Sequence, residues 1–143
     1  MPHPAPHPPA DSSREERVRA TGVPVWTAGR AREAVSRALA GTAGAMTDRE
    51  ADARLVVTEL VTNAICHAGG VTGFEVRVED GGSRLRISVE DADGRHPHGD
   101  FAALRDPSRP GGRGWPIVQL LTDVCEVRPL PGGGKRVSAT LAL

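Results

Sequence analysis

The segment ELVTNAICHA, residues 59–68, contains the side chains whose types and spacing best suit chemistry. Glu59, Asn63 and His67 follow one another at intervals of four, so on a helix they form one row along the edge of an apolar arc. An amide oxygen can bind a hard cation such as Mg²⁺, and a carboxylate one turn away can accept a proton. The alternative is an ordinary amphipathic helix whose polar face happens to carry these three residues.

A second candidate lies where an alternating apolar run ends, in the sequence DADG at residues 91–94. The Asp91 carboxylate can accept a hydrogen bond from a ligand, and Gly94 has no side chain to keep that ligand away from the backbone. Asp and Gly also form ordinary turns. Both interpretations remain open from this segment alone.

A third candidate is GGRGWPIV at residues 111–118, where glycines lead directly into an apolar run. Backbone N–H groups at the positive end of a helix bind anions, so Gly112, Arg113 and Gly114 suit a phosphate group. The segment matches neither a Rossmann fingerprint nor a P-loop, and a flexible loop end is the alternative. The sequence GGGKR at residues 132–136 precedes an alternating run rather than a helix, so a hairpin turn is predicted there.

Three helices are predicted to position these residues. The first is capped by Thr27 and runs to about Ala40, the second runs from Thr47 to about His67, and the third begins at Gly114. Gly69 and Gly70 would end the second helix. The apolar arc predicted for the second helix consists of Val56, Val57, Leu60, Val61, Ala64 and Ile65.

Alternating apolar residues predict two hairpins, over residues 74–89 and 124–143, and a weak edge strand over 19–26. Residues 91–113 are predicted to form a long loop. Consecutive hairpins and three helices indicate an α+β fold. We expect a two-layer sandwich in which a mixed, mostly antiparallel sheet has about three helices on one face.

Composition limits the class of protein. The chain has 143 residues, 18 basic and 18 acidic, with a formal net charge of zero. Neutrality argues against a partner bound through nucleic-acid phosphates, and no apolar run approaches the roughly 20 residues that span a membrane. Two cysteines and no secretory signal favour the cytoplasm. The Pro- and His-rich residues 1–13 are expected to be disordered, which leaves one domain at residues 14–143.

Together and in this order, the three segments resemble the ATP-binding domain of the histidine-kinase-like ATPase superfamily, which has the Bergerat fold. The resemblance is strongest to the small bacterial anti-sigma factor serine kinases of actinobacterial type. ELVTNAICHA is similar to the N box of that family, VEDADG to its adenine-contacting box, and GGRGWPIVQLL to its second glycine box. Lys135 is the only lysine, so phosphate contacts are expected from backbone amides, Mg²⁺ or arginine.

The resemblance implies ATP and Mg²⁺ as cofactors and gives roles to the candidate residues. Asn63 would bind Mg²⁺, Glu59 would be the catalytic base, and Asp91 would accept the amino hydrogen of adenine. The glycines before the third helix would give backbone N–H groups to the phosphates. The remaining cofactor-binding residues that the resemblance implies are His67, Gly94, Gly112, Arg113 and Gly114.

The resemblance also implies a Mg-ATP-dependent protein serine kinase. Such a protein phosphorylates a STAS-type anti-anti-sigma partner, sequesters a sigma factor and often forms a homodimer. The first alternative is a nucleotide-gated partner switch that transfers no phosphoryl group, and the second is a plain interaction domain whose glycine loops are only turns. The Glu59 and Asn63 pair favours the kinase over the switch. Asp93 and Arg95 stand where the adenine box usually has glycines, which puts nucleotide affinity in question.

Overall fold

The computed structural model describes residues 25–42, 47–97 and 114–143. A single 3₁₀ turn, Asp80–Gly82, joins the first two strands. The described elements are α1 (Ala28–Ala40), α2 (Thr47–Ala68), β1 (Gly73–Glu79), β2 (Arg84–Asp91), α3 (Gly114–Leu121), β3 (Val124–Pro129) and β4 (Lys135–Ala142). The weak strand predicted over 19–26 falls almost entirely outside the described residues, and Val25 and Trp26 belong to no strand.

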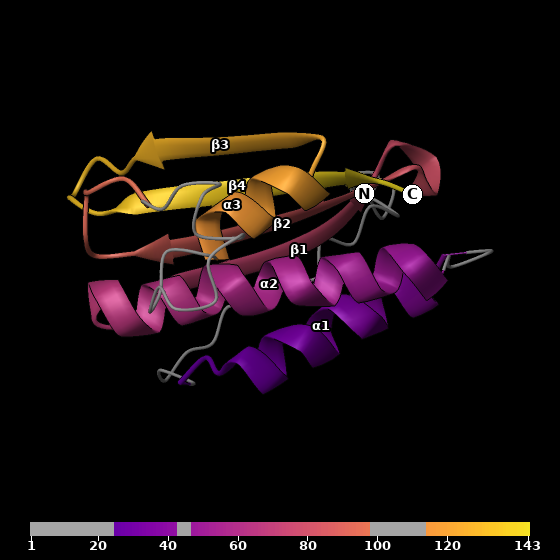
Figure 1. The fold of residues 1–143 in the computed structure, drawn as a ribbon, viewed down its shortest axis with the longest axis horizontal. Coiled ribbons are helices and arrows are strands. Elements are labelled where there is room, and N and C mark those ends of the chain that lie inside the picture. The colour runs from indigo at the N-terminus through magenta and orange to yellow at the C-terminus, as the bar shows by residue number, and fades with distance from the viewer. Residues whose placement is uncertain (1–24, 43–46, 98–113) are drawn as a thin grey trace, which may run out of the picture.

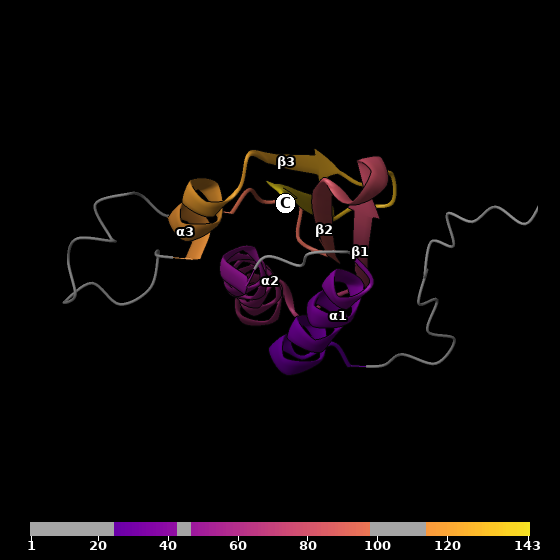
Figure 2. The same cartoon turned by 90° about the vertical axis from the view of Figure 1, so that its right-hand side faces the viewer.

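The four strands form one sheet in the order β1-β2-β4-β3, and each pair of neighbours is antiparallel. The three helices lie on one side of this sheet, as Figures 1 and 2 show in two perpendicular views. The predicted two-layer α+β sandwich is therefore confirmed. The last strand in the sequence, β4, lies between β2 and β3, in the interior of the sheet.

The first helix begins and packs as its sequence indicates. The Thr27 side chain caps it by accepting a hydrogen bond from the Arg30 backbone N–H, with N and Oγ1 3.1 Å apart. Ala31, Val35 and Leu39 recur at intervals of four and are buried. A stripe of this kind gains its stability by packing against a neighbour, because an isolated helix of this length is marginal in water.

The longer α2 lies between α1 and α3 in the helical layer and packs against β2 and β4, whereas α1 packs against β1 (Figure 2). The buried residues of α2 are Ala53, Val56, Val57, Leu60, Val61 and Ala64. The prediction that Ile65 belongs to this arc is wrong, because the Ile65 side chain is 46% exposed. Arg32 near the start of α1 donates a hydrogen bond to Thr58 of α2 over 3.0 Å, so the last turns of α2 extend past α1 (Figure 1).

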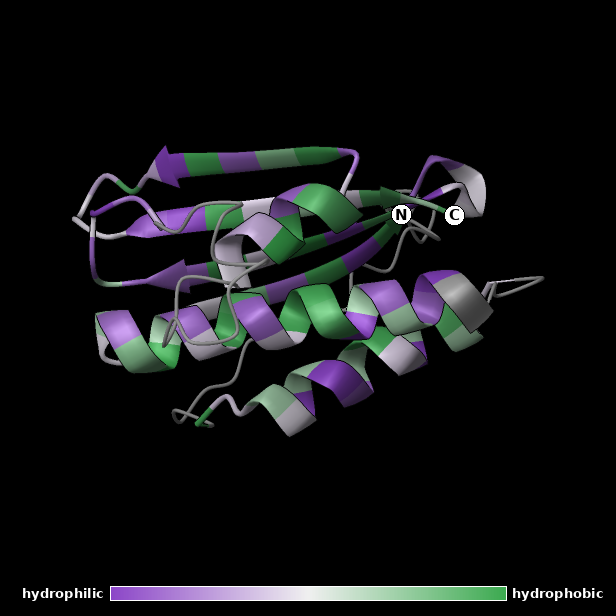
Figure 3. Cartoon of the chain, in the orientation of Figure 1, coloured by the Kyte–Doolittle hydropathy of each residue, from purple (hydrophilic) through white to green (hydrophobic). Residues whose placement is uncertain are grey.

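Both central strands turn an apolar row toward α2. Leu85 and Ile87 of β2 and Ala139 and Leu141 of β4 are fully buried. At one end the rows become polar, as the purple tips of β2 and β4 in Figure 3 show. The residues there are an aspartate and a lysine that face each other in the β2–β4 register. None of the helices in the described ranges is long and apolar enough to cross a membrane.

Candidate functional site

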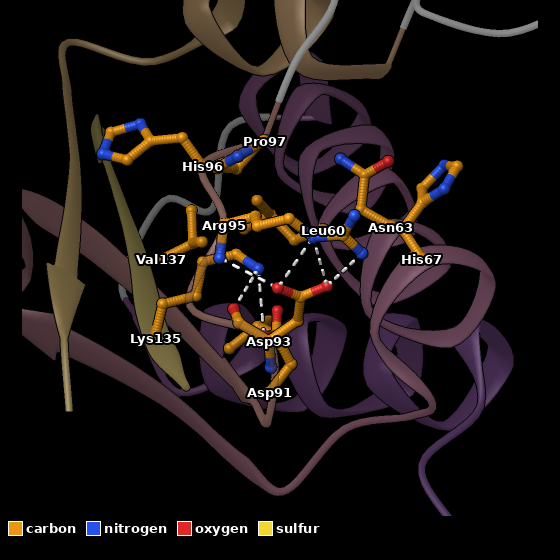
Figure 4. A pocket seen from close by; sticks show the side chains of 11 residues that line it. Leu60, Asn63, His67, Asp91, Asp93, Arg95, His96, Pro97, Lys135 and Val137 are labelled. Carbon is orange, nitrogen blue, oxygen red and sulfur yellow. Dashed lines mark hydrogen bonds and ion pairs between the residues drawn. The ribbon is translucent and has the colours of Figure 1, made fainter. Parts of the chain in front are cut away.

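A cavity of about 170 Å³ lies between α2 and the polar ends of β2 and β4 (Figure 4). Its apolar walls are Leu60, Val89, Pro97 and Val137. Its polar lining residues are Asn63, His67, Asp91, Asp93, Arg95, His96 and Lys135. Sites for drug-sized ligands usually measure about 300–1,000 Å³. The cavity therefore suits one ring system of a ligand rather than a whole nucleotide.

Asp91 is a buried carboxylate at the bottom of this cavity, with only 4% of its surface exposed. Its Oδ1 atom accepts two hydrogen bonds, from Lys135 Nζ over 3.0 Å and from the Asp93 backbone N–H over 2.9 Å. No buried side-chain oxygen in the described part of the chain lacks a hydrogen-bond partner. Because both of these bonds end at Oδ1, the Oδ2 atom is not among the fully buried atoms and can accept a hydrogen bond from the cavity.

Lys135 is the partner of Asp91 and is itself 7% exposed. Its ammonium also donates to the Asp93 carbonyl oxygen over 2.7 Å. A buried ammonium needs such acceptors, because removing a charge from water without a partner is costly. The hairpin turn predicted over 132–136 is present, with β4 beginning at Lys135. Sequence reasoning nevertheless missed this lysine as a site residue, although it begins the alternating run whose other members form the core.

Gly134 holds the turn before Lys135 against the end of β2. Its φ angle is +84°, and a Cβ atom at this position would collide with the backbone carbonyl oxygen of Asp91. Only glycine adopts this conformation without strain and leaves room for the carbonyl group. The turn therefore brings Lys135 and Asp91 into the same cavity wall.

Asp93 and Arg95, the two residues that depart from the glycine pattern, pair with each other. Arg95 Nη2 lies 2.6 Å from Asp93 Oδ2, and Arg95 Nε lies 3.1 Å from Asp93 Oδ1. The hydrogen-bonded Arg95 guanidinium holds the pKa of the Asp93 carboxyl well below its usual value of 3.8. The Asp93–Arg95 ion pair thus stabilises the loop after β2, and a hydrogen bond from Lys135 holds the Asp93 carbonyl in this loop.

The predicted row of Glu59, Asn63 and His67 on α2 is present, but its members face two neighbouring parts of the structure, the cavity and the start of α3. Asn63 and His67 line the cavity, whereas the cavity lining does not include Glu59. A Cβ on Gly114 would collide with Glu59 Oε2 and would lie 3.7 Å from Asn63 Oδ1. The first residue of α3 therefore lies against both side chains. Burial raises the pKa of the Glu59 carboxyl above its usual value of 4.5.

The remaining predicted site residues lie outside the cavity lining or outside the described residues. Gly94 is exposed and lies next to the cavity residues Asp93 and Arg95 without lining the cavity itself. Gly112 and Arg113 lie outside the described residues, as do residues 1–13. Their roles stay predictions.

The oxygen atoms on α2 fit Mg²⁺ of the kind that binds together with a nucleotide. The described residues contain no group of three or more His, Cys, Asp or Glu side chains that could hold a metal ion alone. Mg²⁺ is usually bound by only one or two protein oxygens, with phosphate oxygens and waters as its other ligands. The Asn63 amide, next to the Glu59 carboxylate, can supply such an oxygen.

Comparisons with known proteins show which domains the chain is similar to. The model of the histidine kinase-like ATPase domain family matches residues 25–141. A solved structure, the histidine kinase domain from the Erythrobacter litoralis EL346 blue-light activated histidine kinase, is similar with a TM-score of 0.50 and 24% sequence identity. The similarity covers 81% of this chain and 59% of that chain, and it concerns the fold. No curated protein matches the sequence.

Proposed function

Since the chain belongs to the histidine kinase-like ATPase domain family, we propose that it is a Mg²⁺- and ATP-dependent protein serine kinase. Its substrate is a STAS-type anti-anti-sigma protein, and it also sequesters a sigma factor. The observation that carries the catalytic part of the proposal is the position of the Glu59 carboxylate against Gly114, the first residue of α3. The choice of partners is supported by the resemblance of the three sequence segments to anti-sigma factor kinases.

The adenine ring would enter the cavity between Leu60, Val89 and Val137. Apolar side chains there would pack on the two faces of the ring, and the polar residues at the bottom would contact its edge. Asp91 Oδ2 would accept a hydrogen from the exocyclic amino group. The carboxylate is buried and held by two hydrogen bonds, so it is already oriented before the ligand binds.

The phosphates would lie toward the N-terminus of α3. Backbone N–H groups at a helix N-terminus have no partner within the helix, and the helix dipole adds positive potential there. Asn63 would contribute its amide oxygen to Mg²⁺, which neutralises charge on the phosphate oxygens when it is bound. This arrangement would bring the phosphates beside Glu59 without requiring a lysine.

Glu59 would act as the base for phosphoryl transfer. The partner's serine hydroxyl gives its proton to the Glu59 carboxylate while its oxygen bonds to the γ-phosphorus. The bond between the γ-phosphorus and the β–γ bridging oxygen breaks, and ADP leaves with the electron pair. The raised pKa of Glu59, caused by its burial, makes the carboxylate a better proton acceptor than an exposed one.

The proposal is tested by incubating the full chain with Mg²⁺, γ-labelled ATP and candidate STAS proteins. We expect label on a partner serine with the natural chain and none with Glu59→Gln. Glu50→Gln is the matched control, because it makes the same change near the start of the same helix. Tight ATP binding without transfer to the cognate partner would instead identify the nucleotide-gated switch. The same incubation, followed by size-exclusion chromatography, tests the homodimer that the resemblance implies.

A further inference from the structure

We propose that Lys135 determines base specificity. Its ammonium donates a hydrogen bond to the N1 atom of adenine, next to the amino group from which Asp91 would accept a hydrogen bond. The inference rests on the proposed function, because it concerns the nucleotide of the same site. It adds a residue that none of the three sequence segments contains. Lys135 follows the β3–β4 turn, far in sequence from Asp91, and reaches the cavity only through the β2–β4 pairing.

The Lys135 ammonium has one N–H group left for a ligand. An ammonium has three donors. Two of them bond to Asp91 Oδ1 over 3.0 Å and to the Asp93 carbonyl over 2.7 Å, and these are its hydrogen bonds to described residues. The Lys135 side chain is 9% exposed and lines the cavity, so the third N–H can donate to a ring bound there.

The ammonium is poorly suited to bind phosphate. Its charge is balanced by the Asp91 carboxylate, which is 5% exposed on its side chain and also buried. Its two bonds fix it among the residues that would surround the base, two positions along β4 from Val137, which pairs with Val89 and also lines the cavity. The glycine at the start of α3 instead lies against Glu59 and Asn63. A fixed, neutralised cation in this position serves to recognise the edge of a ring.

Asp91 and Lys135 form an acceptor and a donor side by side. They are direct partners in the β2–β4 register, with Asp91 Oδ2 available as the acceptor and the third ammonium N–H as the donor. Adenine has the complementary pair, an amino donor at N6 and an acceptor at N1. In hypoxanthine the order is reversed, because N1 carries a hydrogen and O6 is an acceptor. In the same position, hypoxanthine would place two donors together and two acceptors together, which strongly disfavours binding.

The loop residues Asp93 and Arg95 support this arrangement. The Asp93 carbonyl accepts from Lys135, its backbone N–H donates to Asp91, and its carboxylate pairs with Arg95. The Asp93 backbone thus holds the ammonium and the carboxylate in fixed relative positions, and the ion pair with Arg95 holds the Asp93 side chain. Asp93, Arg95, Lys135 and Asp91 therefore belong to one hydrogen-bonded network.

Equilibrium binding of nucleotide analogues to the full chain tests the proposal. The analogues are 1-deaza-ATP, in which a C–H group replaces N1, 7-deaza-ATP, which is altered on another edge, and ITP, which carries hypoxanthine. We expect 1-deaza-ATP and ITP to bind at least about tenfold more weakly than ATP, because each loses a hydrogen bond to a charged group. We expect 7-deaza-ATP to bind as ATP does.

The variant Lys135→Met separates recognition from a merely structural role. If Lys135 contacts N1, the variant binds ATP more weakly than the natural chain and no longer distinguishes ATP from 1-deaza-ATP. A structural role would weaken both ligands equally and keep their ratio. Arg136→Met is the matched control, because Arg136 is the next residue, pairs with Glu90 and does not line the cavity. The ratio should be unchanged in this control.

The outcomes distinguish the two proposals. If the natural chain binds ATP and 1-deaza-ATP equally, or binds ITP as tightly as ATP, the role of Lys135 is wrong and the kinase proposal stands. If it binds no ATP at all, both proposals are wrong. If Lys135→Met does not fold, the ratio of ATP to 1-deaza-ATP affinity in the natural chain decides the question.

Discussion

The α-carbon of Gly134 lies so close to the backbone carbonyl of Asp91 that no side chain fits between them. This contact links the β3–β4 turn to the end of β2. Gly134→Ala would combine a clash against backbone with a φ angle of +84° that alanine rarely adopts. We expect it to lower the free energy of unfolding by about 1–3 kcal/mol, as measured by chemical denaturation. Gly132→Ala is the control, because its Cβ would meet nothing within 4 Å; an equal loss there would contradict this explanation.

Replacing Glu59 should separate nucleotide binding from transfer. Glu59→Gln keeps the size of the side chain but cannot accept the serine proton, so we expect the transfer rate to fall by about 10²–10⁴-fold. The affinity for ATP should change little. Single-turnover transfer and equilibrium binding measure the two effects, and an unchanged transfer rate would exclude Glu59 as the base.

The pH dependence of transfer should reflect the burial of Glu59. Its pKa lies above the usual 4.5, so the rate should fall, as pH decreases, at a pH higher than an exposed glutamate would give. A profile of transfer rate against pH checks this. An acidic limb centred at or below 4.5 would contradict the assignment.

The same burial makes a prediction for stability. A carboxyl whose pKa is raised by folding binds its proton more tightly in the folded state, so it costs stability as pH rises past the usual 4.5 and through the raised value. Glu59→Gln removes that cost. At neutral pH we expect a melting temperature equal to or above that of the natural chain, with the difference shrinking toward pH 4. The prediction is contradicted if the variant melts below the natural chain at neutral pH and this deficit becomes smaller at pH 4.

Asn63→Ala should weaken ATP binding only when Mg²⁺ is present. Its amide oxygen would bind the ion, so affinity measured in EDTA should be the same for the variant and the natural chain. Thr62→Ala, on an exposed neighbouring position of α2, is the control. If Asn63→Ala leaves the Mg²⁺-dependent affinity unchanged, the metal-binding role of Asn63 is wrong.

Arg95→Ala should raise the pKa of Asp93 toward 3.8, because the guanidinium is the main cause of the lowered value. A titration of the carboxyl carbon by NMR measures it directly. The ion pair favours the folded state at pH values above 3.8, and this contribution is lost as pH falls through the lowered pKa. Arg128→Ala, which removes an exposed arginine from β3, should leave the Asp93 pKa where it is.

Local periodicity was enough to predict the parts of the site that lie on one element. The row of Glu59, Asn63 and His67 depends only on helical spacing, and the hairpins depend on alternation and on turn residues. Thr27 as the cap of α1 was also readable, because a capping residue acts within one turn. These features required no knowledge of which elements would meet.

Features that depend on contacts between distant segments could not be predicted from local periodicity. Lys135 and Asp91 are 44 residues apart, and their meeting requires β4 to insert beside β2 rather than at the edge of the sheet. A lysine after three glycines therefore indicated only a turn. Ile65 was misplaced for a related reason, since it lies in the last turns of α2, which extend past α1.

The interior position of β4 has a consequence for how the protein is made. A ribosome that has released only the chain up to α3 leaves the β2 edge of the sheet open, because its neighbour has not yet been synthesised. The cavity lacks Lys135 and Val137 until that strand emerges. A nascent chain therefore has no completed site, and the ligand can help to secure the fold only after residues 135–142 have joined the sheet.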